Sequence, residues 1–171
     1  MHLLPPAHVH LIAICGTAMA ALAGMLAEKG FRVTGSDANV YPPMSTLLES
    51  LGIDAHKGFD ARHLNPSPDL IVVGNAVSRG NPEVEAMLDL RIPYMSLPEA
   101  VRELFLRGRR PIVITGTHGK TTTTAMTAHL LDSGGLHPSF LIAGMPANFP
   151  RSFGLGAGEF YVIEGDEYDS A

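Results

Sequence analysis

The stretch Ile112-Val113-Ile114-Thr115-Gly116-Thr117-His118-Gly119-Lys120-Thr121-Thr122-Thr123-Thr124 indicates how the second half of the chain is built. Its β-branched start is typical of a buried strand, and its two glycines predict a tight turn before a helix that begins at Lys120. The first N–H groups of such a helix point outward and favour a bound anion. We therefore interpret the stretch as a phosphate-binding loop.

The residue types of this loop divide the work as in the Walker A pattern. Lys120 is predicted to set its ammonium group against the β and γ phosphates of ATP, and the Thr121 hydroxyl to bind Mg²⁺. The pattern is shortened, because Ile114 stands where the full pattern has its first glycine. The alternative is a simple turn with a solvated lysine. The predicted ATP-binding residues are Gly116, Thr117, His118, Gly119, Lys120, Thr121 and Thr122.

A second polar stretch follows the predicted strand Phe160 to Ile163 and reads Glu164-Gly165-Asp166-Glu167-Tyr168-Asp169. Carboxylate oxygens are the ligands that Mg²⁺ prefers, and one carboxylate together with a loop hydroxyl is a usual way to hold this ion. The predicted metal ligands are therefore Thr121 and one carboxylate of this stretch. The alternative is a solvated acidic turn.

The first half of the chain begins with a predicted strand from Val9 to Cys15. A predicted helix follows and ends at Gly30, and a second strand is predicted from Phe31 to Gly35. Asp37 then comes about 20 residues after Gly16, the spacing at which a Rossmann unit places a ribose-binding acid. Alanines replace the second and third glycines of the dinucleotide fingerprint, which disfavours an NAD site. A ligand-free strand, turn and helix is the alternative. The predicted substrate-binding residues are Gly16, Thr17, Ala18, Met19, Ser36, Asp37, and, at the carboxyl end of the strand Asp69 to Val73, Asn75 and Ala76.

Composition and charge exclude several classes of protein. The 171 residues are 46% hydrophobic, carry a formal net charge of −5 and contain one cysteine. We expect no nucleic-acid partner, no membrane partner and a cytoplasmic location, because the chain has neither a basic face nor a long apolar run. We expect two α/β domains, joined at Arg107 to Pro111: a Rossmann-like parallel-sheet domain over residues 1–108, and the beginning of a P-loop NTPase-like domain over residues 109–171.

Further elements are predicted from local signals. Met44 to Leu51 has the spacing of an amphipathic helix, and Asn81-Pro82-Glu83 has the residue types of a helix start. Ser96 and Glu99 form a capping box ahead of another helix. Phe140 to Ala143 is predicted to be a strand.

The loop Thr115 to Thr122 and the acidic stretch together resemble the corresponding motifs of the Mur ligase family, ATP-dependent enzymes that join amino acids or peptides to UDP-N-acetylmuramic acid. Cys15-Gly16-Thr17, Tyr41-Pro42-Pro43-Met44-Ser45 and Gly74 to Pro82 are most similar to the members that attach the murein tripeptide L-alanyl-γ-D-glutamyl-meso-diaminopimelate to UDP-N-acetylmuramate. Ala20, Ala21 and Ala143 depart from the glycines expected in the family.

The resemblance implies that residues 1–108 bind the UDP-sugar, and that Glu164, the first glutamate of the acidic stretch, binds Mg²⁺ together with Thr121. It also implies that Lys120 is the catalytic residue and, with Mg²⁺, assists transfer of the ATP γ-phosphate to the carboxylate of the UDP-sugar. It also implies that the chain is an amino-terminal fragment of a ligase, inactive by itself and of unknown oligomeric state. Three alternatives stay open: the UDP-N-acetylmuramate:L-alanine ligase of the same family, a non-catalytic nucleotide-binding module, and a P-loop kinase or ATPase.

Overall fold

The structure, a computed structural model, describes residues 3–165. Contacts divide the chain between Ala100 and Val101 into two compact units, here called unit 1 and unit 2. The predicted boundary after residue 108 was placed at the charged joint Arg107 to Pro111. Each unit is described by itself below.

Unit 1 is built on a five-stranded sheet in which every paired strand runs parallel to its neighbour. The strand order is β3-β2-β1-β4-β5. Strands β2 and β3 are added on one side of β1, and β4 and β5 on the other. This arrangement confirms the predicted Rossmann-like parallel sheet. The strands are β1 (His8–Ile12), β2 (Arg32–Asp37), β3 (Asp54–Lys57), β4 (Leu70–Val73) and β5 (Tyr94–Ser96).

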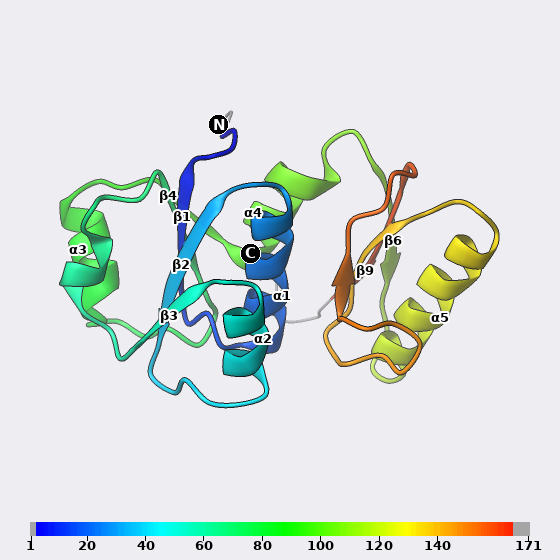
Figure 1. Cartoon of the computed structure of the whole chain (residues 1–171), viewed down its shortest axis with the longest axis horizontal. Coiled ribbons are helices and arrows are strands. Elements are labelled where there is room, and N and C mark those ends of the chain that lie inside the picture. Colours follow the sequence, from blue (N-terminus) through cyan, green and yellow to red (C-terminus); the bar gives the residue numbers. More distant parts are fainter. Residues whose placement is uncertain (1–2, 166–171) are drawn as a thin grey trace. The chain divides into compact units, whose positions relative to one another are not determined.

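Helices cover both faces of this sheet. Figure 1 shows α1 and α2 on one side of the strands and α3 on the other. The side of α3 is closed by a core of buried apolar side chains that includes Ile12, Ile71 and Met87. The helical elements of unit 1 are α1 (Thr17–Glu28), α2 (Met44–Ser50), the 3-10 turn η1 (Ala61–Leu64), α3 (Pro82–Asp89) and the start of α4 (Leu97–Val101).

The first strand ends earlier than its apolar run predicts. β1 stops at Ile12 rather than Cys15, and Ala13 turns the chain with a φ of 68°. The amides of Ala13 and Ile14 both donate to the carbonyl oxygen of Ser36, at 2.8 and 3.0 Å. Ile14 stays buried, but the run bends across the end of β2 instead of extending β1.

The predicted capping box before α4 is confirmed. The Ser96 amide donates to Glu99 Oε2 at 2.8 Å, and the Glu99 amide donates to Ser96 Oγ at 3.4 Å. The helix then continues as a five-residue π-helical segment, η2 (Arg102–Leu106).

Unit 2 has a four-stranded sheet in the order β6-β9-β7-β8. β6 and β7 both run parallel to β9, whereas β8 is antiparallel to β7. The elements are β6 (Arg110–Ile114), α5 (Lys120–Ser133), β7 (Ser139–Leu141), β8 (Phe153–Gly154) and β9 (Phe160–Glu164). Figure 1 shows helix α5 beside this sheet. Ala125 and Ala128 of α5 belong to one buried core cluster with Phe140, Ile142 and Val162.

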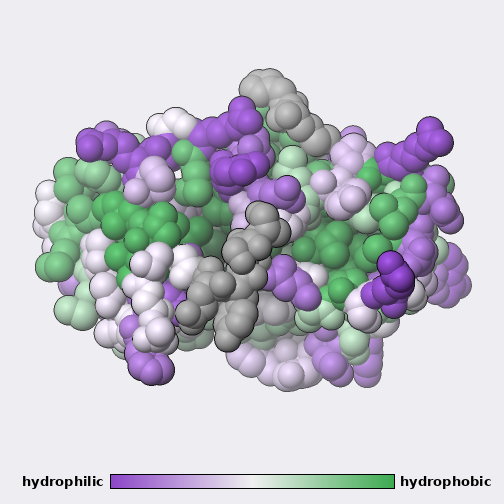
Figure 2. Space-filling model, turned by 180° about the vertical axis from the view of Figure 1, so that it is seen from behind, coloured by the Kyte–Doolittle hydropathy of each residue, from purple (hydrophilic) through white to green (hydrophobic). Residues whose placement is uncertain are grey.

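The surface carries hydrophobic residues as well as polar ones. Figure 2 shows green hydrophobic patches on both halves of the visible face, between purple hydrophilic regions. Exposed apolar side chains of unit 2 include Val113, Met126 and Leu130. Within the described part of the chain, no helix has both the length and the apolar character that a membrane span requires.

Candidate functional site

The predicted phosphate-binding loop lies between β6 and α5. β6 ends at Ile114 and α5 begins at Lys120, so the intervening residues form one compact turn. Gly116 and Gly119 have φ values of 144° and 76°, which side-chain-bearing residues rarely adopt. Lys120 Nζ donates to the Gly116 carbonyl oxygen at 2.7 Å, and this bond holds the ammonium group over the loop.

The other predicted loop residues include three that are accessible to solvent. Thr117, His118 and Thr122 are exposed. The first N–H groups of a helix have no partner inside it, and they carry the positive end of the helix dipole. The loop therefore offers an ammonium group, a helix start and accessible side chains to an anion.

Glu164 meets this loop at the end of β9. Thr121 Oγ1 donates to Glu164 Oε2 at 3.1 Å, and the Ala143 amide donates to Glu164 Oε1 at 2.8 Å. The structure thus brings together the two predicted metal ligands from α5 and β9. The Glu164 carboxylate is also held by Ala143, in the segment that follows β7.

The spacing of these two oxygens fits a magnesium ion. Two adjacent ligands at ~2.0–2.1 Å from an octahedral Mg²⁺ lie about 2.9 Å apart, close to the observed 3.1 Å between Thr121 Oγ1 and Glu164 Oε2. Residues 3–165 contain no group of three His, Cys, Asp or Glu side chains suited to a metal. In nucleotide sites Mg²⁺ is usually held by one or two protein oxygens and completes its shell with water and phosphate. The predicted acidic residues Asp166, Glu167 and Asp169 lie outside the described residues.

Two glycines let neighbouring segments pack closely against the loop threonines. A Cβ added to Gly144 would lie 3.0 Å from Thr121 Cγ2, and one added to Gly165 would lie 2.9 Å from Thr115 Cγ2. The Gly165 amide also donates to the Ile114 carbonyl oxygen at 2.9 Å. Side chains at either glycine would push against the loop threonines.

The predicted substrate residues of unit 1 gather at the carboxyl ends of β2, β1 and β4. These strands are neighbours in the sheet, and their loops are tied together by backbone hydrogen bonds. Besides the two bonds to the Ser36 carbonyl oxygen, the Gly74 amide donates to the Ile12 carbonyl oxygen at 3.0 Å. A Cβ on Gly35 would lie 2.6 Å from Ile14 Cδ1, so glycine is required for the first loop to cross β2.

The individual residues of the first loop differ in exposure. Gly16 is exposed at the start of α1 with a φ of −63°, so the tight turn comes from Ala13 rather than from Gly16. Thr17 and Ala18 are half-buried in the first helical turn. Met19 is buried, and a Cβ on Gly74 would lie 3.6 Å from its Cγ. Its side chain therefore packs inward.

The remaining predicted contacts flank this loop. Asp37 Oδ2 accepts from the Cys15 amide at 2.9 Å, and Asp37 Oδ1 accepts from the Asn39 amide at 3.0 Å. The carboxylate therefore holds two loops in place, whatever ligand contact it makes. Asn75 and Ala76 are exposed in the turn after β4.

Cys15 is half-buried beside Asp37. Burial raises the pKa of the Cys15 thiol, and the nearby Asp37 carboxylate raises it further. The thiol is therefore protonated at neutral pH, which argues against a nucleophilic role.

Behind these loops lies a buried carboxylate that the sequence analysis treated only as part of a helix start. Glu83 is fully buried in the first turn of α3. Its Oε1 accepts from the Asp60 amide at 3.1 Å and from His63 Nδ1 at 2.6 Å. Its Oε2 accepts from the Ser36 hydroxyl and lies 3.6 Å from Nε2 of the buried His10.

The pKa of Glu83 reflects this environment. Burial by itself raises the pKa of the carboxyl group, but His10, Ser36, His63 and the Asp60 amide together outweigh it, and the pKa lies below its ordinary value. Glu83 is therefore ionised in the folded protein at neutral pH.

This shift predicts a pH-dependent contribution to stability. Because the pKa is lower in the folded state, the stabilising contribution is present above the unfolded pKa of ~4.3 and is lost as the pH falls through the folded value. The difference in unfolding free energy between the native protein and Glu83→Gln should therefore shrink below pH ~4.3. Urea unfolding from pH 7 downward measures it. Glu85→Gln, at an exposed position of the same helix, controls for loss of one charge, and a constant Glu83→Gln difference would contradict the prediction.

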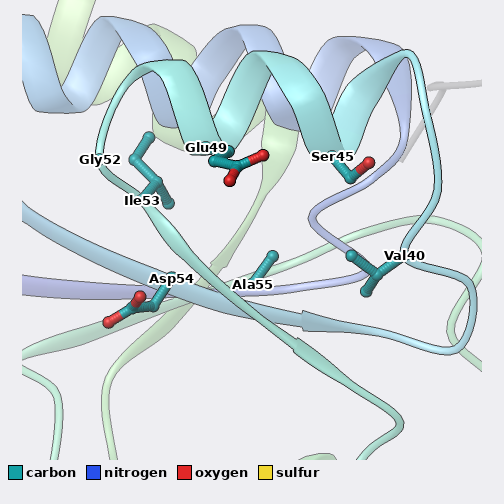
Figure 3. A pocket seen from close by; sticks show the side chains of 7 residues that line it. All are labelled: Val40, Ser45, Glu49, Gly52, Ile53, Asp54 and Ala55. Atoms are coloured by element: carbon teal, nitrogen blue, oxygen red, sulfur yellow. The ribbon is translucent and has the colours of Figure 1, made fainter.

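A separate cavity of about 350 Å³ lies between α2 and β3. Figure 3 shows Ser45 and Glu49 on α2 facing Ala55 on β3, with Val40 at one end. None of the predicted substrate residues lines it. The cavity is therefore distinct from the loop edge described above.

The sequence did not predict the buried groups that support the loops at the carboxyl edge of the unit 1 sheet. Glu83, His10 and His63 come from three elements, and only their meeting in space makes them a cluster. The alternation of His8 and His10 with apolar residues along β1 was the one available signal, since it predicts a polar strand face. The supporting glycines Gly35 and Gly74 carried no such signal.

Comparison with known proteins places this geometry in a family. The model of the Mur ligase family, catalytic domain, matches residues 8–109. The Escherichia coli K12 protein named UDP-N-acetylmuramate–L-alanyl-gamma-D-glutamyl-meso-2,6-diaminoheptandioate ligase is 53% identical over 95% of this chain and 36% of its own length. A UDP-N-acetylmuramate–L-alanine ligase of Acidithiobacillus ferrooxidans is 40% identical over 95% of this chain and 34% of its own length.

A solved structure gives the same picture. The crystal structure of UDP-N-acetylmuramate:L-alanyl-gamma-D-glutamyl-meso-diaminopimelate ligase from Neisseria meningitidis has a TM-score of 0.90 and 46% identity, covering 96% of this chain and 54% of that chain. The chain thus spans about a third of the length of the curated relatives it matches. On the match of the family model to more than half of its residues, the chain belongs to the Mur ligase family.

Proposed function

We propose that the whole protein is an ATP-dependent ligase of the cytoplasm that joins L-alanyl-γ-D-glutamyl-meso-diaminopimelate to UDP-N-acetylmuramate, in recycling of cell-wall peptide. One observation carries the choice of acceptor. Over the same share of this chain, identity is 53% to a relative named for the tripeptide and 40% to one named for L-alanine. The proposed chemistry needs sites for a UDP-sugar and for ATP, and each unit offers a loop edge suited to one of them.

In unit 1 the proposed ligand is UDP-N-acetylmuramate. The exposed start of α1 at Gly16 would face the diphosphate, because helix N–H groups attract anions. Asp37, Asn75 and Ala76 would make the neighbouring contacts from the ends of β2 and β4. Ser36 and Met19 turn their side chains inward, so any contact that they make with the ligand would come from their backbone.

In unit 2 the proposed ligand is ATP. The lactyl carboxylate of the muramate would attack the γ-phosphorus, ADP would leave, and an acyl phosphate would form. The amine of the tripeptide would then attack the acyl carbon and expel phosphate, with loss of a proton. Lys120 would stabilise the negative charge on the transferring phosphoryl group from its position over the loop.

Thr121 and Glu164 are the proposed protein ligands of Mg²⁺. When bound, the ion would neutralise phosphate charge and orient the γ-phosphate. Glu164 would keep its orientation through the Ala143 amide.

The proposed acceptor predicts strong discrimination. With ATP and saturating UDP-N-acetylmuramate, kcat/KM for the tripeptide should exceed that for L-alanine by at least ~10²-fold, because a pocket built for a charged peptide leaves polar groups unpaired around alanine. Phosphate release by the whole enzyme, with each acceptor titrated to saturation, measures both constants.

The same experiment tests the alternative. A higher kcat/KM for L-alanine would assign the protein to the L-alanine ligases, a reading that the 40% identity to one of them supports. Binding of UDP-N-acetylmuramate and ATP without phosphate release would point to a non-catalytic module.

A further inference from the structure

Glu83 joins three segments at the carboxyl edge of the sheet in unit 1. Its carboxylate accepts from the hydroxyl of Ser36 on β2, from the amide of Asp60 ahead of η1, and from the ring of His63 within η1. Both Glu83 and Ser36 are fully buried. An ionised group at such a depth persists because its donors satisfy it.

The bond to Ser36 reaches the substrate loop in one further step. The Ser36 side chain is anchored on Glu83, and its carbonyl oxygen accepts from the amides of Ala13 and Ile14 at 2.8 and 3.0 Å. These two residues form the turn that ends β1 and leads to Gly16. A shift in Ser36 would therefore move the turn on which the start of α1 depends.

Glu83 itself cannot touch the ligand. It is fully buried, and its oxygens are occupied by groups of β2, η1 and the loop before η1. Its helix is also set independently, because Asn81 Oδ1 accepts from the Glu83 and Val84 amides at 2.9 and 3.2 Å. The carboxylate is thus a fixed point against which Ser36 is held.

We infer that Glu83 is a positioning residue for the UDP-sugar: acting through the Ser36 hydroxyl, it holds the Ala13–Ile14 turn and hence the Gly16 loop in the shape that binds the diphosphate. The inference rests on the proposed function. By this inference Glu83, on α3, affects the affinity for UDP-N-acetylmuramate, here called the donor, and takes no part in phosphoryl transfer.

Glu83→Gln weakens the link to Ser36 and removes the negative charge that also faces His63 and His10. The Asp60 amide can only donate, so the glutamine must turn its carbonyl oxygen toward Asp60 and its NH₂ group toward Ser36. The Ser36 hydroxyl must then accept from a neutral NH₂ group instead of donating to a carboxylate, and charge-assisted hydrogen bonds are roughly twice as strong as neutral ones. Ser36→Ala removes the bond altogether.

The decisive comparison measures KM for UDP-N-acetylmuramate, KM for ATP and kcat in the whole enzyme, for each single variant and for the double variant. We expect KM for UDP-N-acetylmuramate to rise about fivefold in Glu83→Gln and about tenfold in Ser36→Ala, with kcat and KM for ATP within about twofold of native; tenfold corresponds to ~1.4 kcal/mol, one hydrogen bond. The double variant should match Ser36→Ala alone, since both changes cut one path. Glu85→Gln, at an exposed position of the same helix, should leave KM unchanged.

Other outcomes would overturn the inference. A double variant with the product of the two effects, about fiftyfold, would mean that Glu83 acts on the donor independently of Ser36. An unchanged donor KM in Glu83→Gln, or a fall in kcat with KM unchanged, would remove the positioning role. If Glu83→Gln does not fold, Ser36→Ala alone must still raise the donor KM without changing kcat.

Hydrogen exchange separates this inference from the proposed function. In Glu83→Gln the amides of Ala13 and Ile14 should exchange faster than in the native protein without any ligand, whereas that of Leu11 within β1 should not change. Unchanged exchange would contradict the inference even if the ligase activity is correct. Faster exchange in a protein that does not bind UDP-N-acetylmuramate would instead overturn the proposed function and leave the mechanical link intact.

Discussion

Lys120→Ala in the whole enzyme is expected to lower kcat for ligation by at least ~10³-fold while leaving UDP-N-acetylmuramate binding unchanged. The ammonium group lies over the loop that the proposed mechanism assigns to the ATP phosphates, 2.7 Å from the Gly116 carbonyl oxygen. Groups that neutralise charge on a transferring phosphoryl group contribute ~10³-fold or more to its transfer. The Gly16 loop, which is proposed to bind UDP-N-acetylmuramate, belongs to unit 1, so affinity for this ligand should not depend on Lys120.

Phosphate release measures the first half of this result, and calorimetry with UDP-N-acetylmuramate measures the second. Lys29→Ala is a matched control, because Lys29 is exposed at the opposite end of α1 from Gly16. Native kcat in the Lys120 variant would remove the loop from the mechanism. A parallel loss of donor binding would show that the variant is not properly folded.

Glu164→Gln should lower kcat by about 10²-fold and raise the Mg²⁺ concentration needed for half-maximal activity. The substitution keeps the size of the side chain, and its amide oxygen can still accept from either Thr121 or the Ala143 amide. It removes one negative charge from a pair of oxygens whose spacing suits this ion. The loss should therefore be recovered in part by more magnesium.

A titration of activity against Mg²⁺ at fixed ATP checks this expectation. Glu159→Gln is the control, since Glu159 precedes the same strand and pairs only at the surface, with Arg110 at 3.3 Å. If Glu164→Gln leaves the magnesium dependence unchanged, the metal carboxylate must be sought at Asp166 or Glu167.

Local signals predicted β6, α5 and the loop between them. The β-branched run before Gly116 and the helix from Lys120 were identified because strand propensity, glycine and helix start follow one another within a few residues. The capping box of Ser96 and Glu99 was identified for the same reason. The pairing of Thr121 with Glu164 also followed, since parallel neighbouring strands bring their carboxyl ends to one edge.

The ends of elements and the buried polar cluster were beyond such reasoning. The apolar run from Val9 to Cys15 gives no sign that β1 stops at Ile12, because the turn at Ala13 depends on a carbonyl oxygen of β2. The spacing from Gly16 predicts Asp37 as a ligand-binding residue, but only the fold shows that its two oxygens accept hydrogen bonds from loop amides.

The sequence by itself determined the alternation of strands and helices, the glycine-containing loop between β6 and α5, and the family. Each depends on residues close together in the chain, so their types and spacing are sufficient. Only the tertiary structure decided the role of Glu83, because hydrogen bonds from Ser36, Asp60 and His63 reach it from segments far away in sequence. A buried carboxylate is tolerated only where the folded chain supplies its donors, and a linear pattern does not record that supply.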